Sequence, residues 1–182
     1  MPASDPAVLR AAFVRTVGER DRIHVTRSDG SEASWPFPTY GDRLPHDLVH
    51  LVVEAAFGLS RGFWGRVDEG ADPRRIGDQA NRAGGADKYA AYGPDQRELV
   101  LAEALANAPW AGDAEDLPPQ IAAACEAAAV EPPAGVSPER IRAVKDVLAG
   151  LAARWRSLDP KGALHVSFDR SAPRRSFDAL SS

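Results

Sequence analysis

The sequence has 182 residues and a formal net charge of −4, with 22 basic and 26 acidic side chains. This length favours one compact domain, and a hydrophobic content of 44% excludes wholesale disorder. The slight acidic excess argues against a nucleic-acid partner, and no apolar run approaches the roughly 18 residues of a membrane span. We therefore expect a single globular domain over residues 1–182, with a polar, frayed tail from about residue 170.

The N-terminal pattern and the cysteine content predict a cytoplasmic protein. A signal peptide has basic residues followed by an unbroken apolar run, whereas here Asp5 comes first and Arg10 and Arg15 interrupt the apolar residues. Cys125 is the single cysteine, so neither an intramolecular disulfide nor a cysteine-based zinc site is expected, and its alanine-rich surroundings predict a buried thiol. The abundance of alanine, arginine, proline and glycine suggests a bacterial genome rich in GC.

Two segments alternate apolar and polar residues, as half-buried strands do. In the first, Ile23 and Val25 point to one side, and residues 28–31 contain the Asp-Gly pair of a tight hairpin turn. A return strand over residues 33–37 contains two prolines, which place it at a sheet edge or end it early. The second segment covers residues 164–168, near the C-terminus.

Helical signals occupy the chain between these strands. Pro45 suits the first helical position and Gly58 suits the C-terminal stop, which predicts a helix to about Phe57, followed by a glycine-rich connection over residues 59–93. Further helices are predicted at residues 74–82, from Pro94 past Leu105, between the proline pairs at 118–119 and 132–133, and from Pro138 to Trp155. The sequence therefore predicts an α+β fold, in which a small antiparallel sheet of the N-terminal hairpin and the C-terminal strand is covered by three or four helices.

The pattern with the most chemical content runs from His46 to His50 and reads His-Asp-Leu-Val-His. Residues four apart on a helix are neighbours on its surface, so the two imidazoles can bind one zinc or other divalent metal ion. Glu54 follows one turn later on the same face. The third ligand is open among Glu54, His24 and His165, the histidines coming from the polar faces of the predicted strands.

This five-residue pattern resembles the His-Glu-x-x-His helix of zincin metallopeptidases, with Asp47 in place of the glutamate. The resemblance implies a metal-dependent hydrolase, in which Asp47 or Glu54 assists as a catalytic carboxylate toward a metal-bound water. The aspartate side chain is one methylene shorter than glutamate and reaches less far. The alternative interpretation is structural: His46 bonds polar groups at the helix start, and His50 is half-buried with one hydrogen bond.

A longer segment, within about residues 20–70, resembles a family of small bacterial proteins of unassigned function. The shared residues are Gly-Asp at 41–42, Leu-Pro-His-Asp-Leu-Val-His at 44–50, Val-Val-Glu at 52–54 and Gly-Phe-Trp-Gly at 62–65. The resemblance implies that this stretch is one structural unit and implies no activity.

Phe63 and Trp64 provide the alternative function. If exposed, the two rings form an apolar platform for another protein, with Arg66 nearby for an anion; if buried, they seal the core over the helix of His46. The sequence thus leaves two functions open. One is divalent-metal binding with metal-dependent hydrolysis as its chemistry, and the other is a non-catalytic protein-interaction or structural domain.

Overall fold

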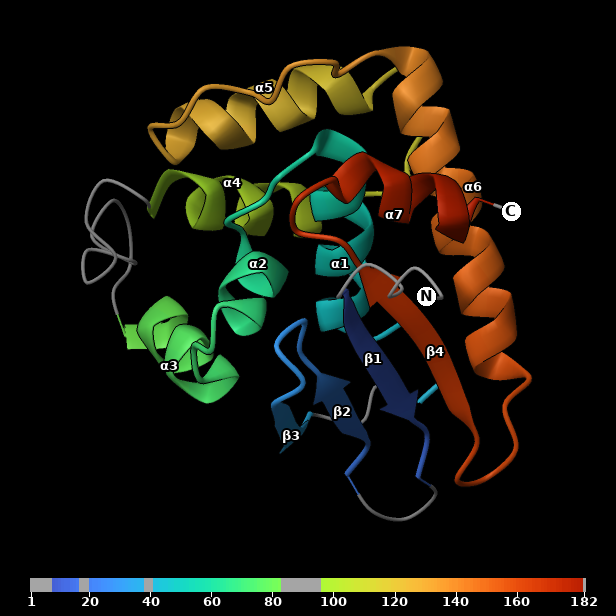
Figure 1. Ribbon diagram of the computed structural model, residues 1–182. Coiled ribbons are helices and arrows are strands. Elements are labelled where there is room, and N and C mark those ends of the chain that lie inside the picture. Colours follow the sequence, from blue (N-terminus) through green and yellow to red (C-terminus); the bar gives the residue numbers. More distant parts are fainter. Residues whose placement is uncertain (1–7, 17–19, 38–40, 83–95, 182) are drawn as a thin grey trace, which may run out of the picture.

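The computed structural model describes residues 8–16, 20–37, 41–82 and 96–181. Within these ranges the strands form one antiparallel sheet in the spatial order β3-β2-β1-β4. Figure 1 shows the sheet in the lower part of the molecule, with α4, α5 and α7 at the opposite end. The strands are β1 (Leu9–Val14), β2 (Arg22–Thr26), β3 (Glu32–Pro36) and β4 (Ala163–Phe168).

The predicted hairpin and C-terminal strand are confirmed as β2, β3 and β4, and the α+β class is confirmed with them. β1 lies between β2 and β4 and pairs with both, and it was not predicted from the sequence. Leu9 and Phe13 of β1 are fully buried, but the outward positions include Ala12 and Val14, so the apolar and polar alternation is weak. One of the two interior strands, β1, therefore had the least distinctive pattern of the four.

Seven helices lie in the described ranges. The predicted helices appear as α1, α3, α5 and α6, and Cys125 on α5 is buried as expected. The helix predicted from Pro94 appears as α4, beginning at Gln96, while Pro94 itself lies outside the described residues. α2 was not predicted, because its segment looked like a glycine-rich connection. The helices are α1 (His46–Phe57), α2 (Phe63–Asp68), α3 (Pro73–Arg82), α4 (Gln96–Ala106), α5 (Leu117–Ala127), α6 (Pro138–Arg156) and α7 (Pro173–Leu180).

The tail expected to fray from about residue 170 instead forms α7. Pro173, Ser176 and Phe177 are buried, and α7 packs against α1. These buried positions lie about one helical turn apart and therefore form a narrow face of α7. The arginines and the aspartate around them make the segment polar on average, which is why it was expected to fray. This face holds the C-terminal helix on the core.

One face of the sheet packs against the helices, and the other faces solvent. The central helix is α1, which contacts α2, α4, α6 and α7 and has nine buried residues among its twelve. A polar group on so buried a helix must find partners within the protein. No helix in the described part of the chain is long and apolar enough to cross a membrane. The inward residues of the sheet are Leu9, Ala11, Phe13, Ile23, Val25, Trp35, Leu164, Val166 and Phe168.

The start of α2 depends on a side chain from α1. The Glu54 carboxylate is fully buried and accepts hydrogen bonds from the backbone N–H groups of Phe63 and Trp64, at 2.8 and 2.9 Å. A Cβ atom at Gly62 would lie 2.5 Å from the Glu54 carboxyl carbon. Only glycine at this position therefore leaves room for the carboxylate to reach the backbone of α2.

We predict that Gly62→Ala lowers the free energy of unfolding by about 1–3 kcal/mol, because the added methyl group overpacks the Glu54 pocket. Urea denaturation followed by circular dichroism measures the change. Gly150→Ala on α6 is the matched control, since an added Cβ there meets nothing within 4 Å. That control is expected to be neutral or to stabilise by roughly 0.5–1 kcal/mol. Equal stability of the two variants would contradict the role of Gly62.

Candidate metal site

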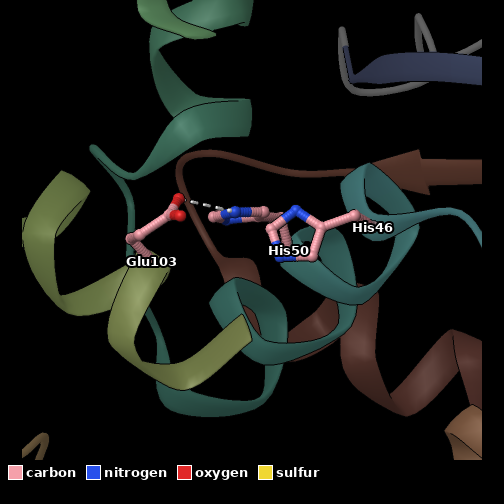
Figure 2. Close-up of side chains that lie close together, drawn as sticks. All are labelled: His46, His50 and Glu103. Carbon is pink, nitrogen blue, oxygen red and sulfur yellow. Dashed lines mark ion pairs between the residues drawn. The ribbon is translucent and has the colours of Figure 1, made fainter. Parts of the chain in front are cut away.

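The structure brings together two of the predicted ligands and one residue that was not predicted. His46 lies in the first turn of α1 and His50 one turn later, and their rings meet edge to face with centroids 4.8 Å apart. Glu103 on α4 faces them from across the contact between the two helices, as Figure 2 shows. One ligand atom from each of the three residues lies within 4.8 Å of the other two.

His50 lies between two carboxylates. The ring is 5% exposed, with Nε2 3.2 Å from Oε2 of Glu103 and Nδ1 3.5 Å from Oε1 of Glu54. Burial alone would lower the pKa of His50, but the hydrogen bonds and charges of Glu103 and Glu54 outweigh burial and raise this pKa to about 9. The two carboxylates therefore stabilise a proton on the His50 ring.

His46 is half-buried, and its Nε2 is buried without a hydrogen-bond partner among the described residues. Burial, and then the neighbouring charge of His50, lower the pKa of His46 below its ordinary value. The imidazole is thus neutral at neutral pH, the form that binds metal ions. A hydrogen bond between His46 and Asn107 opposes this lowering in part, so the His46 ring also has a polar partner next to Glu103.

Glu103 links this cluster to the protein surface. Its side chain is 24% exposed, and the Asn107 amide donates to Oε1 at 2.9 Å while Oε2 faces His50. Glu103 and Asn107 also line a cavity of about 430 Å³ between α4 and α5. Glu103 was not predicted as a ligand because it is distant from His46 and His50 in the chain. Its local sequence, a glutamate between Ala102 and Ala104 on an amphipathic helix, does not distinguish it from many other glutamates.

The predicted third ligands lie elsewhere. Glu54 contacts His50 but directs its two oxygens to the backbone of α2. His24 and His165 are exposed on the outward face of the sheet, which is opposite to the face that packs against the helices. The structure therefore places Glu103, and none of these three residues, in the group with His46 and His50.

The predicted catalytic carboxylate of Asp47 faces the sheet. Its Oδ2 accepts a hydrogen bond from Nε1 of Trp35 at 3.2 Å, and its backbone carbonyl accepts one from Nε1 of Trp64 at 2.7 Å. Asp47 thus connects α1 to β3 and α2. Glu54 has an analogous connecting role, so both nominated carboxylates already have hydrogen-bond donors.

Phe63 and Trp64 are buried, at 8% and 0% exposure. The Phe63 ring lies 5.6 Å from the His50 ring, centroid to centroid, and packs beside Trp64 and Trp35. The two rings are therefore buried and seal the core over α1, and they do not form an exposed platform. The protein-interaction alternative therefore has no exposed aromatic platform at these residues.

Comparison of the chain with protein-family models, with curated proteins and with solved structures gives no match. No relative therefore transfers a ligand set or an activity to these residues.

We predict that the metal-free protein becomes less stable as the pH rises from about 6.5 through about 9. The pKa of His50 is about 9 in the folded state against 6.5 as the ordinary value, so folding favours the protonated ring. That stabilisation is complete below the unfolded pKa and disappears as the pH rises through the folded one.

Urea denaturation in the presence of a chelator at pH 6, 7.5 and 9 measures this dependence. The control is His50→Gln, which keeps a polar side chain but cannot be protonated. The stability lost between pH 6 and pH 9 should be clearly smaller in this variant than in the natural protein. Identical losses would show that His50 is not protonated between the two carboxylates.

Proposed function

We propose that the protein binds one divalent metal ion, with zinc preferred, through His46, His50 and Glu103. The observation that carries this proposal is the convergence of two imidazoles and one carboxylate within 4.8 Å, from two helices that pack together. Two histidines and one carboxylate are a zinc ligand set that leaves a fourth coordination position for water or substrate.

The distances suit an ion with a small adjustment. With bonds of about 2.0–2.1 Å to zinc, tetrahedral ligand atoms lie about 3.4 Å apart. Nε2 of His50 and Oε2 of Glu103 are already 3.2 Å apart. The largest separation in the group is 4.8 Å and must close by about 1.4 Å to reach this value, and His46 lies half-buried in the first turn of its helix.

Glu54 supports this arrangement from behind His50. A metal ion on Nε2 leaves the Nδ1 proton facing Glu54, which gives a carboxylate–histidine–metal arrangement. Such a carboxylate fixes the tautomer and orientation of the ring and strengthens it as a ligand. The same geometry also serves the structural alternative, in which a proton on His50 joins α1 to α4.

The chemistry assigned to the site is binding. A bound zinc ion supplies Lewis acidity, and Glu103 connects the ion to the cavity between α4 and α5. Hydrolysis needs a free carboxylate beside a metal-bound water. Asp47 bonds to Trp35, and Glu54 bonds to the backbone of α2, so neither residue expected from the zincin resemblance is free for that role.

We predict that the purified, chelator-treated protein binds one Zn²⁺ or Co²⁺ per chain, measured by calorimetric titration and by elemental analysis after dialysis. Glu103→Gln and His46→Ala should each weaken binding at least tenfold, because each removes one of three ligands. The matched controls are His24→Ala and His165→Ala, which remove exposed histidines far from the cluster and should leave the affinity unchanged.

Circular dichroism and urea denaturation of every variant establish that it is folded before it is titrated. Glu103→Gln keeps the hydrogen bond of Asn107 to a side-chain oxygen, so the folded state should persist. The proposal fails if the natural protein shows no binding of one ion per chain. It also fails if folded Glu103→Gln binds the metal as tightly as His24→Ala does.

A further inference from the structure

The outward face of the sheet carries a second group of polar side chains, separate from the metal cluster. The strand register places Ala12 of β1 directly between His24 of β2 and His165 of β4. Arg10 lies two residues away on β1, and alternate residues of a strand share a face. Arg10, His24 and His165 are all exposed. Three strands thus each contribute a nitrogen-bearing side chain to this face.

These three side chains surround one point. Directly opposed residues in an antiparallel pair have Cβ atoms about 4.5–5.5 Å apart, and diagonal neighbours are about 7–8 Å apart. Arg10 is diagonal to both His24 and His165, and all three line the same hollow as Ala12. A small residue surrounded by three long ones forms the floor of a hollow.

This hollow has the size of a ligand site. Its volume is about 550 Å³, within the range of small-molecule pockets. Beyond the three nitrogen-bearing residues it is lined by hydroxyl groups and one carboxylate, from Thr26, Ser34 and Glu32. These polar side chains lie on the outward face of the strands, so they do not contribute to the packing of the core.

The hydrogen-bond donors of the hollow suit an anion. Among the described residues, the side chains of Arg10, His24 and His165 have neither an ion pair nor a hydrogen bond. The chain as a whole has a net charge of −4, so an unpaired guanidinium beside two imidazoles differs from the average surface. Glu32, the one acid of the lining, is on the edge strand β3, with β2 between it and Arg10.

We propose that this hollow binds a small phosphorylated molecule that also carries hydroxyl groups. A tetrahedral oxyanion offers acceptors in several directions at once, which matches donors converging from three strands, whereas a carboxylate offers two oxygens in one plane. The phosphate lies over Ala12, between Arg10, His24 and His165. The ligand hydroxyls lie toward Thr26 and Glu32, where the carboxylate accepts their hydrogen bonds. The guanidinium of Arg10 disfavours a metal ion at this point.

Nuclear magnetic resonance titration of the full-length, isotope-labelled protein tests the proposal, with ribose 5-phosphate, inorganic phosphate and ribose as probes. Ribose 5-phosphate is expected to shift the resonances of Ala12, His24 and His165, and inorganic phosphate to shift them more weakly. Ribose without the phosphate should shift none of them. Equal responses to ribose and ribose 5-phosphate would overturn the proposal.

Two variants locate the ligand. Arg10→Gln should weaken ribose 5-phosphate binding at least tenfold, whereas Arg154→Gln, which removes the same charge from an exposed position on α6, should not change it. Ala12→Leu fills the hollow from the outward face without altering a charge, and should abolish binding in a protein that is still folded.

Unchanged affinity in folded Arg10→Gln and Ala12→Leu would overturn the assignment. Much tighter binding of a single-stranded oligonucleotide than of the monomer would also overturn it, in favour of a nucleic-acid surface. The metal site lies on the other side of the sheet, so zinc titrations of these variants should match those of the natural protein. The two proposals can therefore fail separately.

Discussion

The interaction on which the rest of the structure depends is the burial of the Glu54 carboxylate in the centre of the fold. Moving a charged carboxylate out of water costs several kcal/mol unless donors replace the lost water molecules. The backbone N–H groups of Phe63 and Trp64 supply two donors, and the His50 ring faces the same carboxylate. Burial still raises the pKa of Glu54, which shows that desolvation is only partly offset.

This one carboxylate positions two parts of the molecule. Its bonds to the backbone fix where α2 begins and so place Trp64, whose indole N–H reaches back to the carbonyl of Asp47 on α1. Its contact with His50 leaves Nε2 of that ring pointing to Glu103. A buried line of polar groups therefore runs from Glu54 through His50 to the partly exposed Glu103. The fold and the candidate site share residues, so variants of the site need a separate measurement of folding.

The sequence predicted those helices and strands whose formation depends on residues close together in the chain. The hairpin of β2 and β3, the helix of His46 and His50, and the long helix α6 all have periodic apolar positions and clear termini. The pairing of the two histidines followed from the same local geometry. Such roles are set within one or two turns of chain, and for this reason they can be read from spacing alone.

The features that were not predicted from the sequence depend on contacts between distant segments of the chain. β1 is an interior strand although its outward residues are partly apolar, and its place is set by pairing with β2 on one edge and with β4 on the other. Glu103 joined the cluster through the packing of α4 on α1, which no local pattern encodes. Glu54 has the spacing of a metal ligand, yet two backbone amides of α2 compete for its oxygens. The partners that folding brings close to Glu103 and Glu54 therefore determine the roles of these two side chains.

X-ray absorption spectroscopy at the zinc edge of the zinc-loaded protein identifies the atoms bonded to the ion. We expect two imidazole nitrogens and a carboxylate oxygen bonded to zinc, at about 2.0–2.2 Å. The imidazole signal should disappear when His46 and His50 are both replaced by alanine in a chain that remains folded. A spectrum without imidazole scattering, or one that survives this double replacement, would contradict zinc binding by these two histidines.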